Sequence, residues 1–109
     1  DAGRHGEGWF DFNMFGNQIT LKQAATAIEN KESYRFGEEL IPTFHFGVLV
    51  NMPTWAYLYQ KFADKEFMAI DKTKFLESSV GEHVSFFIED PDGYVIEFKC
   101  FSEPGEIFS

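Results

Sequence analysis

Two side chains that commonly bind metal ions stand in the middle of separate strand-like runs. His45 lies in the apolar run 43–50, and Glu97 lies in the run 94–100. Because a strand alternates its side chains between two faces, the large apolar residues of 94–100 share one face and Glu97 occupies the other. An imidazole and a carboxylate on separate strands are typical ligands of a divalent metal. A histidine with apolar neighbours is also typical of a hydrogen-bonded core residue, so both interpretations stay open.

A carboxylate in mid-strand needs a partner. Burial of an unpaired carboxylate is costly or forces the group to take up a proton. A cation, an arginine or a water-filled cavity must therefore lie beside Glu97. The sequence predicts that His45 and Glu97 line one cavity, which either holds a metal or is a metal-free pocket.

The second half of the chain changes from a period of two to a period of 3.6 and back. This pattern predicts strands at 43–50, 67–71, 84–90 and 94–100, and a helix at 54–65. Three strands after a helix place the last strand beside the first. Large residues of the helix recur at the spacing of one face and predict a stripe that packs on the sheet: Trp55, Leu58, Tyr59 and Phe62.

The first 40 residues are less regular. Residues 1–8 are rich in glycine and predict a mobile lead-in, in which His5 is exposed to solvent. Alternation and a glycine turn predict a hairpin of 9–15 with 18–22. Residues 24–40 contain little apolar material, which indicates an excursion or a short helix.

Two motifs and the helix between them carry a resemblance to a known family. His-Phe-Gly-Val stands at 45–48, and Phe-Phe-x-x-Asp-Pro-x-Gly-x-x-x-Glu-Phe-Lys stands at 86–99. This order resembles the second module of the vicinal oxygen chelate superfamily, which includes glyoxalase I, extradiol dioxygenases, and fosfomycin and bleomycin resistance proteins. The resemblance covers residues 9–23 and 43–108.

The resemblance implies an α+β fold of paired βαβββ modules that enclose a metal cavity. His45 and Glu97 match the two ligand positions of the second module. The chain is then one glyoxalase/dioxygenase-like domain, 1–109, in which 1–40 is the remnant of the first module and 41–109 is the second. The opening strand, the helix and the second strand of the first module are expected to be missing, and with that opening strand the family's first ligand.

The third metal ligand is the point at which the chain departs from the resemblance. Relatives continue their Phe-Gly turn as Gly-His-Gln and carry a further histidine soon after, where this chain has Asn17 and Lys22. A protonated lysine cannot bind a metal. Gln18, Thr20 and Gln23 offer oxygen atoms nearby, but amides and hydroxyls are weaker ligands than imidazole or carboxylate.

The resemblance implies a metal-dependent enzyme of the glyoxalase or extradiol dioxygenase type, acting on a small substrate with vicinal oxygens. Fe, Mn, Ni or Zn would suit a histidine and a carboxylate with open positions. The alternative is a protein of the bleomycin-resistance type that binds a small molecule without turnover. His83 and Tyr94 are the candidate acid–base groups. Large aromatic residues are candidates for the pocket wall, although ordinary core is the common role of each: Trp9, Phe10, Phe12, Phe15, Phe44, Phe46, Trp55 and Phe86.

Composition excludes several partners. The 109 residues carry 18 acidic and 9 basic side chains, a formal charge of −9, which repels nucleic acid. No apolar stretch approaches the roughly 20 residues that span a bilayer.

The single Cys100 indicates a buried structural thiol and fits a reducing cytoplasm. A chain that lacks part of a module exposes sheet edges and apolar surface, so a homodimer is expected. The sequence shows no Ser-His-Asp, Walker or paired-cysteine motif.

Overall fold

The computed structural model describes residues 2–25, 33–36, 38–42 and 45–107. Its centre is a four-stranded sheet with the order β6-β9-β8-β7. The outer strand β6 runs parallel to β9, whereas the other neighbours are antiparallel. The last strand therefore lies beside the first, as the sequence predicted. The strands are β6 (His45–Leu49), β7 (Met68–Phe75), β8 (His83–Glu89) and β9 (Val95–Phe101).

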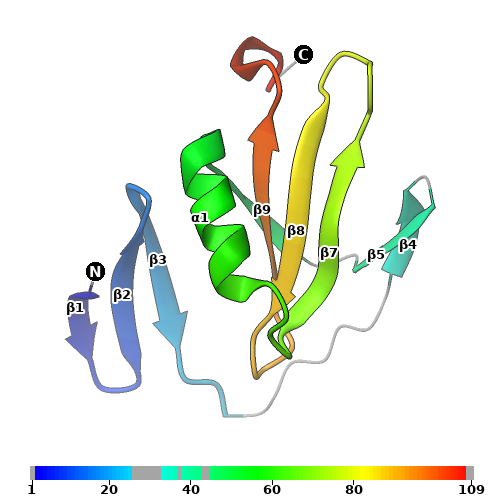
Figure 1. Ribbon diagram of the computed structural model, residues 1–109. Coiled ribbons are helices and arrows are strands. Elements are labelled where there is room, and N and C mark those ends of the chain that lie inside the picture. Colours follow the sequence, from blue (N-terminus) through cyan, green and yellow to red (C-terminus); the bar gives the residue numbers. More distant parts are fainter. Residues whose placement is uncertain (1, 26–32, 37, 43–44, 108–109) are drawn as a thin grey trace.

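Helix α1 (Met52–Phe62) covers one face of this sheet (Figure 1). It starts at Asn51, whose side-chain oxygen accepts a hydrogen bond from the backbone N–H of Thr54. Pro53 lies in the first turn, where its missing N–H costs no helical hydrogen bond. The helical stripe predicted from spacing contacts the sheet: Trp55 is part of the core, and Leu58, Tyr59 and Phe62 pack against it.

The core between helix and sheet is built around Phe86, whose side chain is fully buried. Trp55 contacts the Phe86 ring edge-on and donates its indole N–H to the carbonyl of Phe98 at 3.0 Å. That hydrogen bond removes the cost of burying the indole nitrogen. The remaining buried residues of this cluster are Val48, Phe98 and Cys100. Burial raises the pKa of the Cys100 thiol, as expected for a structural cysteine.

The predicted strands and helix exist, with shifted ends. The helix begins at residue 52 rather than 54, because Asn51 supplies the cap. The strand predicted at 67–71 continues to Phe75, through charged residues interpreted as a loop or strand edge. It is the edge strand beside β8, so its charged side chains reach solvent while its backbone pairs on one side. Residues 43 and 44 lie outside the described part of the chain.

A polar contact joins the helix to this edge strand. The hydroxyl of Tyr59 donates to Asp71 Oδ1 at 2.5 Å, and the backbone N–H of Lys72 donates to the same oxygen. The hydrogen bond lowers the pKa of the Asp71 carboxyl and raises the pKa of the Tyr59 hydroxyl. The contact fixes α1 against β7.

The N-terminal sheet has three strands, one more than the sequence predicted. β2 (Trp9–Met14) and β3 (Asn17–Lys22) form the expected hairpin, and β1 (Ala2–Gly6) pairs antiparallel with β2. The prediction of a mobile lead-in for residues 1–8 is therefore wrong over β1. Glycine weakens a strand but does not prevent pairing, and Gly3 lets β1 approach β2 closely, since a Cβ there would lie 3.1 Å from the carbonyl oxygen of Asp11.

A second hairpin replaces the excursion or short helix expected at 24–40. β4 (Ser33–Phe36) pairs with β5 (Glu39–Pro42), while residues 26–32 and 37 are outside the described part. Ile41 of β5 is buried against Phe75, Phe87 and Val95, on the face of the sheet opposite α1. The hairpin forms because these apolar side chains cover a second, smaller core, a tertiary contact that the local sequence does not reveal.

The two larger sheets repeat one arrangement. The order β3-β2-β1 corresponds to β9-β8-β7, and among the described residues the N-terminal sheet has no counterpart of α1 or β6. The fold is therefore α+β, with one βαβββ module and an incomplete N-terminal module, as the sequence predicted. The expectation that the second strand of the N-terminal module is missing is wrong, because β1 pairs with β2 as the counterpart of β7. Met14 packs against the core beneath α1, and Figure 1 shows the N-terminal sheet on the helix side of the molecule. None of the described helices has the length and apolar character to cross a membrane.

We expect Phe86→Ala to lower the free energy of unfolding by about 3–5 kcal/mol, because it leaves a cavity at a fully buried site. Tyr57→Ala is the matched control, since Tyr57 is an aromatic residue of α1 that is 63% exposed, and its loss should change stability by less than about 0.5 kcal/mol. Urea unfolding of the two variants measures both values. Equal losses would contradict the proposed core.

Candidate functional site

The parallel pair β6–β9 brings the two predicted ligands together. Gly47 lies opposite Glu97 in the register, and His45 lies two residues earlier on the same strand face. His45 Nε2 is 3.4 Å from Glu97 Oε1. A Cβ at Gly47 would lie 3.7 Å from that carboxylate oxygen, so glycine leaves open the space beside the pair. The structure thus places both side chains at one point, while their role as metal ligands stays a prediction.

Glu97 is buried, and both of its carboxylate oxygens have polar partners. Its Oε2 accepts a hydrogen bond from Ser85 Oγ at 2.7 Å, and Lys99 Nζ lies 3.7 Å away from the same oxygen. Glu97 is only 5% exposed, and Ser85 on the neighbouring strand is fully buried. The hydroxyl and the ammonium offset the cost of burying the carboxylate. The partner that sequence analysis required is therefore a lysine two residues along the strand together with a serine across it.

His45 is held in one orientation by its other ring nitrogen. His45 Nδ1 lies 2.8 Å from the carbonyl oxygen of Pro42. A carbonyl only accepts, so Nδ1 carries the hydrogen. In a neutral ring Nε2 then presents a lone pair towards Glu97, and two acceptors facing each other require a proton or a cation between them. A donor bond from Nδ1 to a backbone carbonyl also orients the histidines that bind metals.

The pair forms the polar end of a cavity of about 170 Å³ on the face of the sheet opposite α1. The walls are apolar and come from both the sheet and the β4–β5 hairpin. Phe36 meets Phe75 edge-on, with ring centroids 5.5 Å apart, and closes one side. The other lining residues are Tyr34, Ile41, His83, Phe87 and Lys99.

The aromatic residues expected in the wall mostly lie elsewhere. Trp55 and Phe86 are core beneath α1, and Phe46 is partly exposed without lining the cavity. Trp9, Phe10, Phe12 and Phe15 belong to the N-terminal sheet and its turn, and Phe44 is outside the described residues. The cavity lies on the sheet face opposite α1, so the aromatic residues that line it come from that face.

Only one of the two candidate acid–base groups lines the cavity. His83 lines the cavity, where its Nδ1 contacts the carbonyl of Gly81 at 2.8 Å and its ring stacks on Phe75. Tyr94 follows the turn before β9 and is not among the residues that line the cavity. His5 is exposed on β1, as predicted. A proton-transfer role remains a prediction for His83.

The donor set suits a divalent metal only in part. Within the described ranges, no three His, Cys, Asp or Glu side chains are grouped closely enough to hold a metal. Lys22 is exposed on β3, whereas Gln18 and Thr20 bond to Asp11 rather than to His45 or Glu97. The Lys99 ammonium near Glu97 also disfavours a second positive charge at that carboxylate. His45 and Glu97 would therefore hold an ion only with further ligands.

Sequence reasoning missed the residues that complete the site. Lys99 could have been found, because period two places it on the strand face of Glu97. Ser85 carries a weaker signal, as the small polar residue of the opposite strand in the same hairpin. No sequence signal points to Tyr34 and Phe36, since their hairpin reaches the sheet only through tertiary packing.

Comparison with known proteins gives a fold but no sequence relative. No protein-family model matches the chain, and no curated protein matches it. The crystal structure of a glyoxalase/bleomycin resistance protein/dioxygenase from Alicyclobacillus acidocaldarius superposes with a TM-score of 0.77 at 19% identity, covering 98% of this chain and 76% of that one. The chain has the glyoxalase/bleomycin resistance protein/dioxygenase fold. This result agrees with the vicinal oxygen chelate resemblance of its motifs.

A structure of a glyoxalase/bleomycin resistance protein/dioxygenase superfamily member from Vibrio splendidus is similar more loosely, with a TM-score of 0.44 at 14% identity. It covers 85% of this chain and 68% of that one. The glyoxalase/bleomycin resistance/dioxygenase fold hosts both enzymes and binding proteins, so the activity must be argued from the site.

Proposed function

We propose that this chain binds a small organic molecule in the His45–Glu97 cavity, as a binding protein of the bleomycin-resistance type does. The observation that supports this function is a cavity with aromatic walls and one charged, hydrogen-bonded end. Ligand pockets commonly combine apolar walls with a few convergent polar groups. At about 170 Å³ the cavity is close to the size that admits a single aromatic ring.

The polar end of the cavity determines which polar groups a ligand must carry. Glu97 accepts hydrogen bonds, and Lys99 donates them from an adjacent position on the same strand face. A ligand with one hydroxyl donor beside one oxygen acceptor satisfies both groups. The proposed ligand is therefore a one-ring compound with neighbouring oxygen substituents, of which catechol is a simple probe.

We expect catechol to bind more tightly than phenol or benzoate, because one of its neighbouring hydroxyls donates to Glu97 while the oxygen of the other accepts from Lys99. Lys99→Met should weaken catechol binding by about tenfold or more, since a charge-assisted hydrogen bond is lost. Ligand-observed NMR titration measures the affinities.

Lys61→Met is the matched control, because Lys61 lies on α1 and contacts the exposed Tyr57 ring instead of the cavity. It removes the same charge and should leave catechol binding unchanged. Equal weakening by both variants, or no saturable binding of any one-ring oxygen compound, would remove the cavity from consideration as a binding site.

A metal-dependent enzyme of the glyoxalase or extradiol dioxygenase type is the second candidate. The orientation of His45 favours it, because the contact of Nδ1 with Pro42 directs Nε2 at Glu97 Oε1. In this function His45 and Glu97 hold Fe, Mn, Ni or Zn, and His83 is the nearby acid–base candidate. The ion would polarise two vicinal oxygens of the substrate. Consumption of the ring compound only in the presence of metal separates an enzyme from a binding protein.

If His45 and Glu97 hold a metal, added Mn(II), Fe(II), Ni(II) or Zn(II) should raise the melting temperature of the wild type. Binding at about 100 times the Kd stabilises a protein by about 2.7 kcal/mol. The effect should disappear in His45→Ala and Glu97→Gln, and persist in the control His5→Ala, whose histidine is exposed on β1. A wild-type melting temperature that none of these metals shifts would exclude Glu97 as a ligand.

We also propose a homodimer, because the N-terminal sheet exposes an apolar face. Phe10 and Leu21 are cross-strand neighbours on that face, and both are exposed large apolar residues. Within the described residues, β3 and β6 are edge strands with one unpaired side. Light scattering should give the mass of two chains, and Leu21→Glu should give one. A monomeric wild type at high micromolar concentration would contradict the proposal.

A further inference from the structure

Two carboxylates are buried in the described part of the chain, and they have similar surroundings. Asp11 and Glu97 are each 5% exposed. Asp11 Oδ1 accepts a hydrogen bond from Thr20 at 2.6 Å, as Glu97 accepts one from Ser85. In both cases the hydroxyl comes from the neighbouring strand. Asp11 thus belongs to a second polar site, in the N-terminal sheet, that the His45 cavity does not include.

The two sites differ in how the positive partner is held. Lys99 is 26% exposed and lies within the walls of the His45 cavity, whereas Arg4 is 81% exposed. Arg4 Nη2 reaches Asp11 Oδ2 at 3.5 Å, and Gln18 Nε2 donates to the same oxygen at 2.9 Å. An ion pair with an exposed arginine contributes little, so Arg4 is a weakly held occupant of the Asp11 carboxylate.

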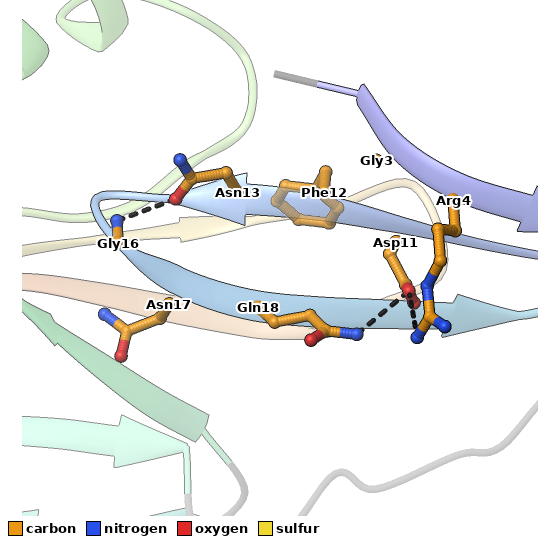
Figure 2. A pocket seen from close by; sticks show the side chains of 8 residues that line it. All are labelled: Gly3, Arg4, Asp11, Phe12, Asn13, Gly16, Asn17 and Gln18. Carbon is orange, nitrogen blue, oxygen red and sulfur yellow. Dashed lines mark hydrogen bonds and ion pairs between the residues drawn. The ribbon is translucent and has the colours of Figure 1, made fainter.

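The backbone of β1 aims Arg4 at this point. In the register Ala2 pairs with Phe12 and His5 pairs with Phe10, so β1 has one extra residue where Gly3 and Arg4 lie. A bulge of this kind redirects a side chain out of the regular alternation. The guanidinium consequently lies over Asp11, as Figure 2 shows.

Asp11 forms the floor of an open hollow of about 310 Å³, and Figure 2 shows Arg4 and Gln18 converging on it from two strands. The turn between β2 and β3 supplies polar amides to the rim. Asn13 Oδ1 accepts the backbone N–H of Gly16, and Asn17 lies beside it. The rim therefore offers amide groups around a buried negative charge.

We propose that this hollow binds a small organic cation that ends in a guanidinium or ammonium group, and that Arg4 occupies the place of the ligand when none is bound. Three observations support this ligand class. Asp11 is a buried carboxylate whose positive partner is almost fully exposed. The hollow has room for more than the Arg4 side chain. The chain carries a formal charge of −9, which attracts cations.

The test uses methylguanidinium as the probe and methylurea as its neutral counterpart of the same shape. Two-dimensional amide NMR titration of the full chain should show saturable shifts at Gly16, Gln18 and Thr20 with methylguanidinium and none with methylurea. Asp11→Asn should weaken methylguanidinium binding by at least about tenfold, because it removes the charge from the acceptor.

The sign of the Arg4→Ala effect is the decisive result. If Arg4 competes with the ligand, its removal should tighten methylguanidinium binding by about two- to fivefold. Lys22→Ala is the matched control, since it removes the same charge from an exposed position on β3 that does not line the hollow. It should tighten binding less than Arg4→Ala does. This comparison decides the question even if Asp11→Asn does not fold.

Three results would overturn the proposal. One is equal binding of methylurea and methylguanidinium. Another is methylguanidinium binding that Arg4→Ala weakens or leaves unchanged. The third is saturable binding of inorganic phosphate at the same amides that Arg4→Ala abolishes, which would make the hollow an anion site built on Arg4. Binding that Glu97→Gln leaves unaltered would show that the hollow acts independently of the His45 cavity.

Discussion

The parallel pairing of β6 with β9 is the constraint on which the cavity depends. It joins the first strand of the module to the last and sets Gly47 opposite Glu97. Without this pairing, the strand that carries His45 would not lie beside the strand that carries Glu97. α1 connects β6 to β7, which run in the same direction at opposite edges of the sheet, so the connecting chain must cross over one face. The cavity consequently forms on the other face.

The burial of charge explains why each polar site combines a carboxylate, a hydroxyl donor and a positive group. A carboxylate taken out of water is tolerated where hydrogen bonds and a positive group replace the solvent. Glu97 obtains these from Ser85 and Lys99, which the antiparallel hairpin β8–β9 holds in register. Asp11 obtains hydrogen bonds from Thr20 and Gln18 on the paired strand β3, but its positive group comes from a bulged edge strand. Lys99 is less exposed than Arg4 because β9 is a central strand of its sheet, whereas β1 is an edge strand.

The local sequence pattern was sufficient to predict the elements of the second module, whose helix and strands pack against one another. The alternation in 94–100 predicted that Glu97 faces away from Phe98 and Cys100, which do form the core beneath α1. The stripe on α1 was predicted for the same reason, since apolar spacing reflects the face that is buried. The predictions for residues 1–8 and 24–40 were wrong where the structure describes strands, because those segments have weak local preferences and pair through neighbours.

The sequence by itself determined the order of strands and helix from His45 onward and the strand face of Glu97, because period and turn residues are local properties. The fold class followed from the resemblance of its motifs to a known family. Only the tertiary structure decided which other segments surround Glu97. The place of Lys99 on this face follows from the strand period, whereas Ser85 and the β4–β5 hairpin meet at the cavity through pairing and packing between distant segments. The same holds for Arg4, which reaches Asp11 because a bulge changes the alternation of β1. Register and bulges arise from contacts across strands, and a linear pattern does not contain them.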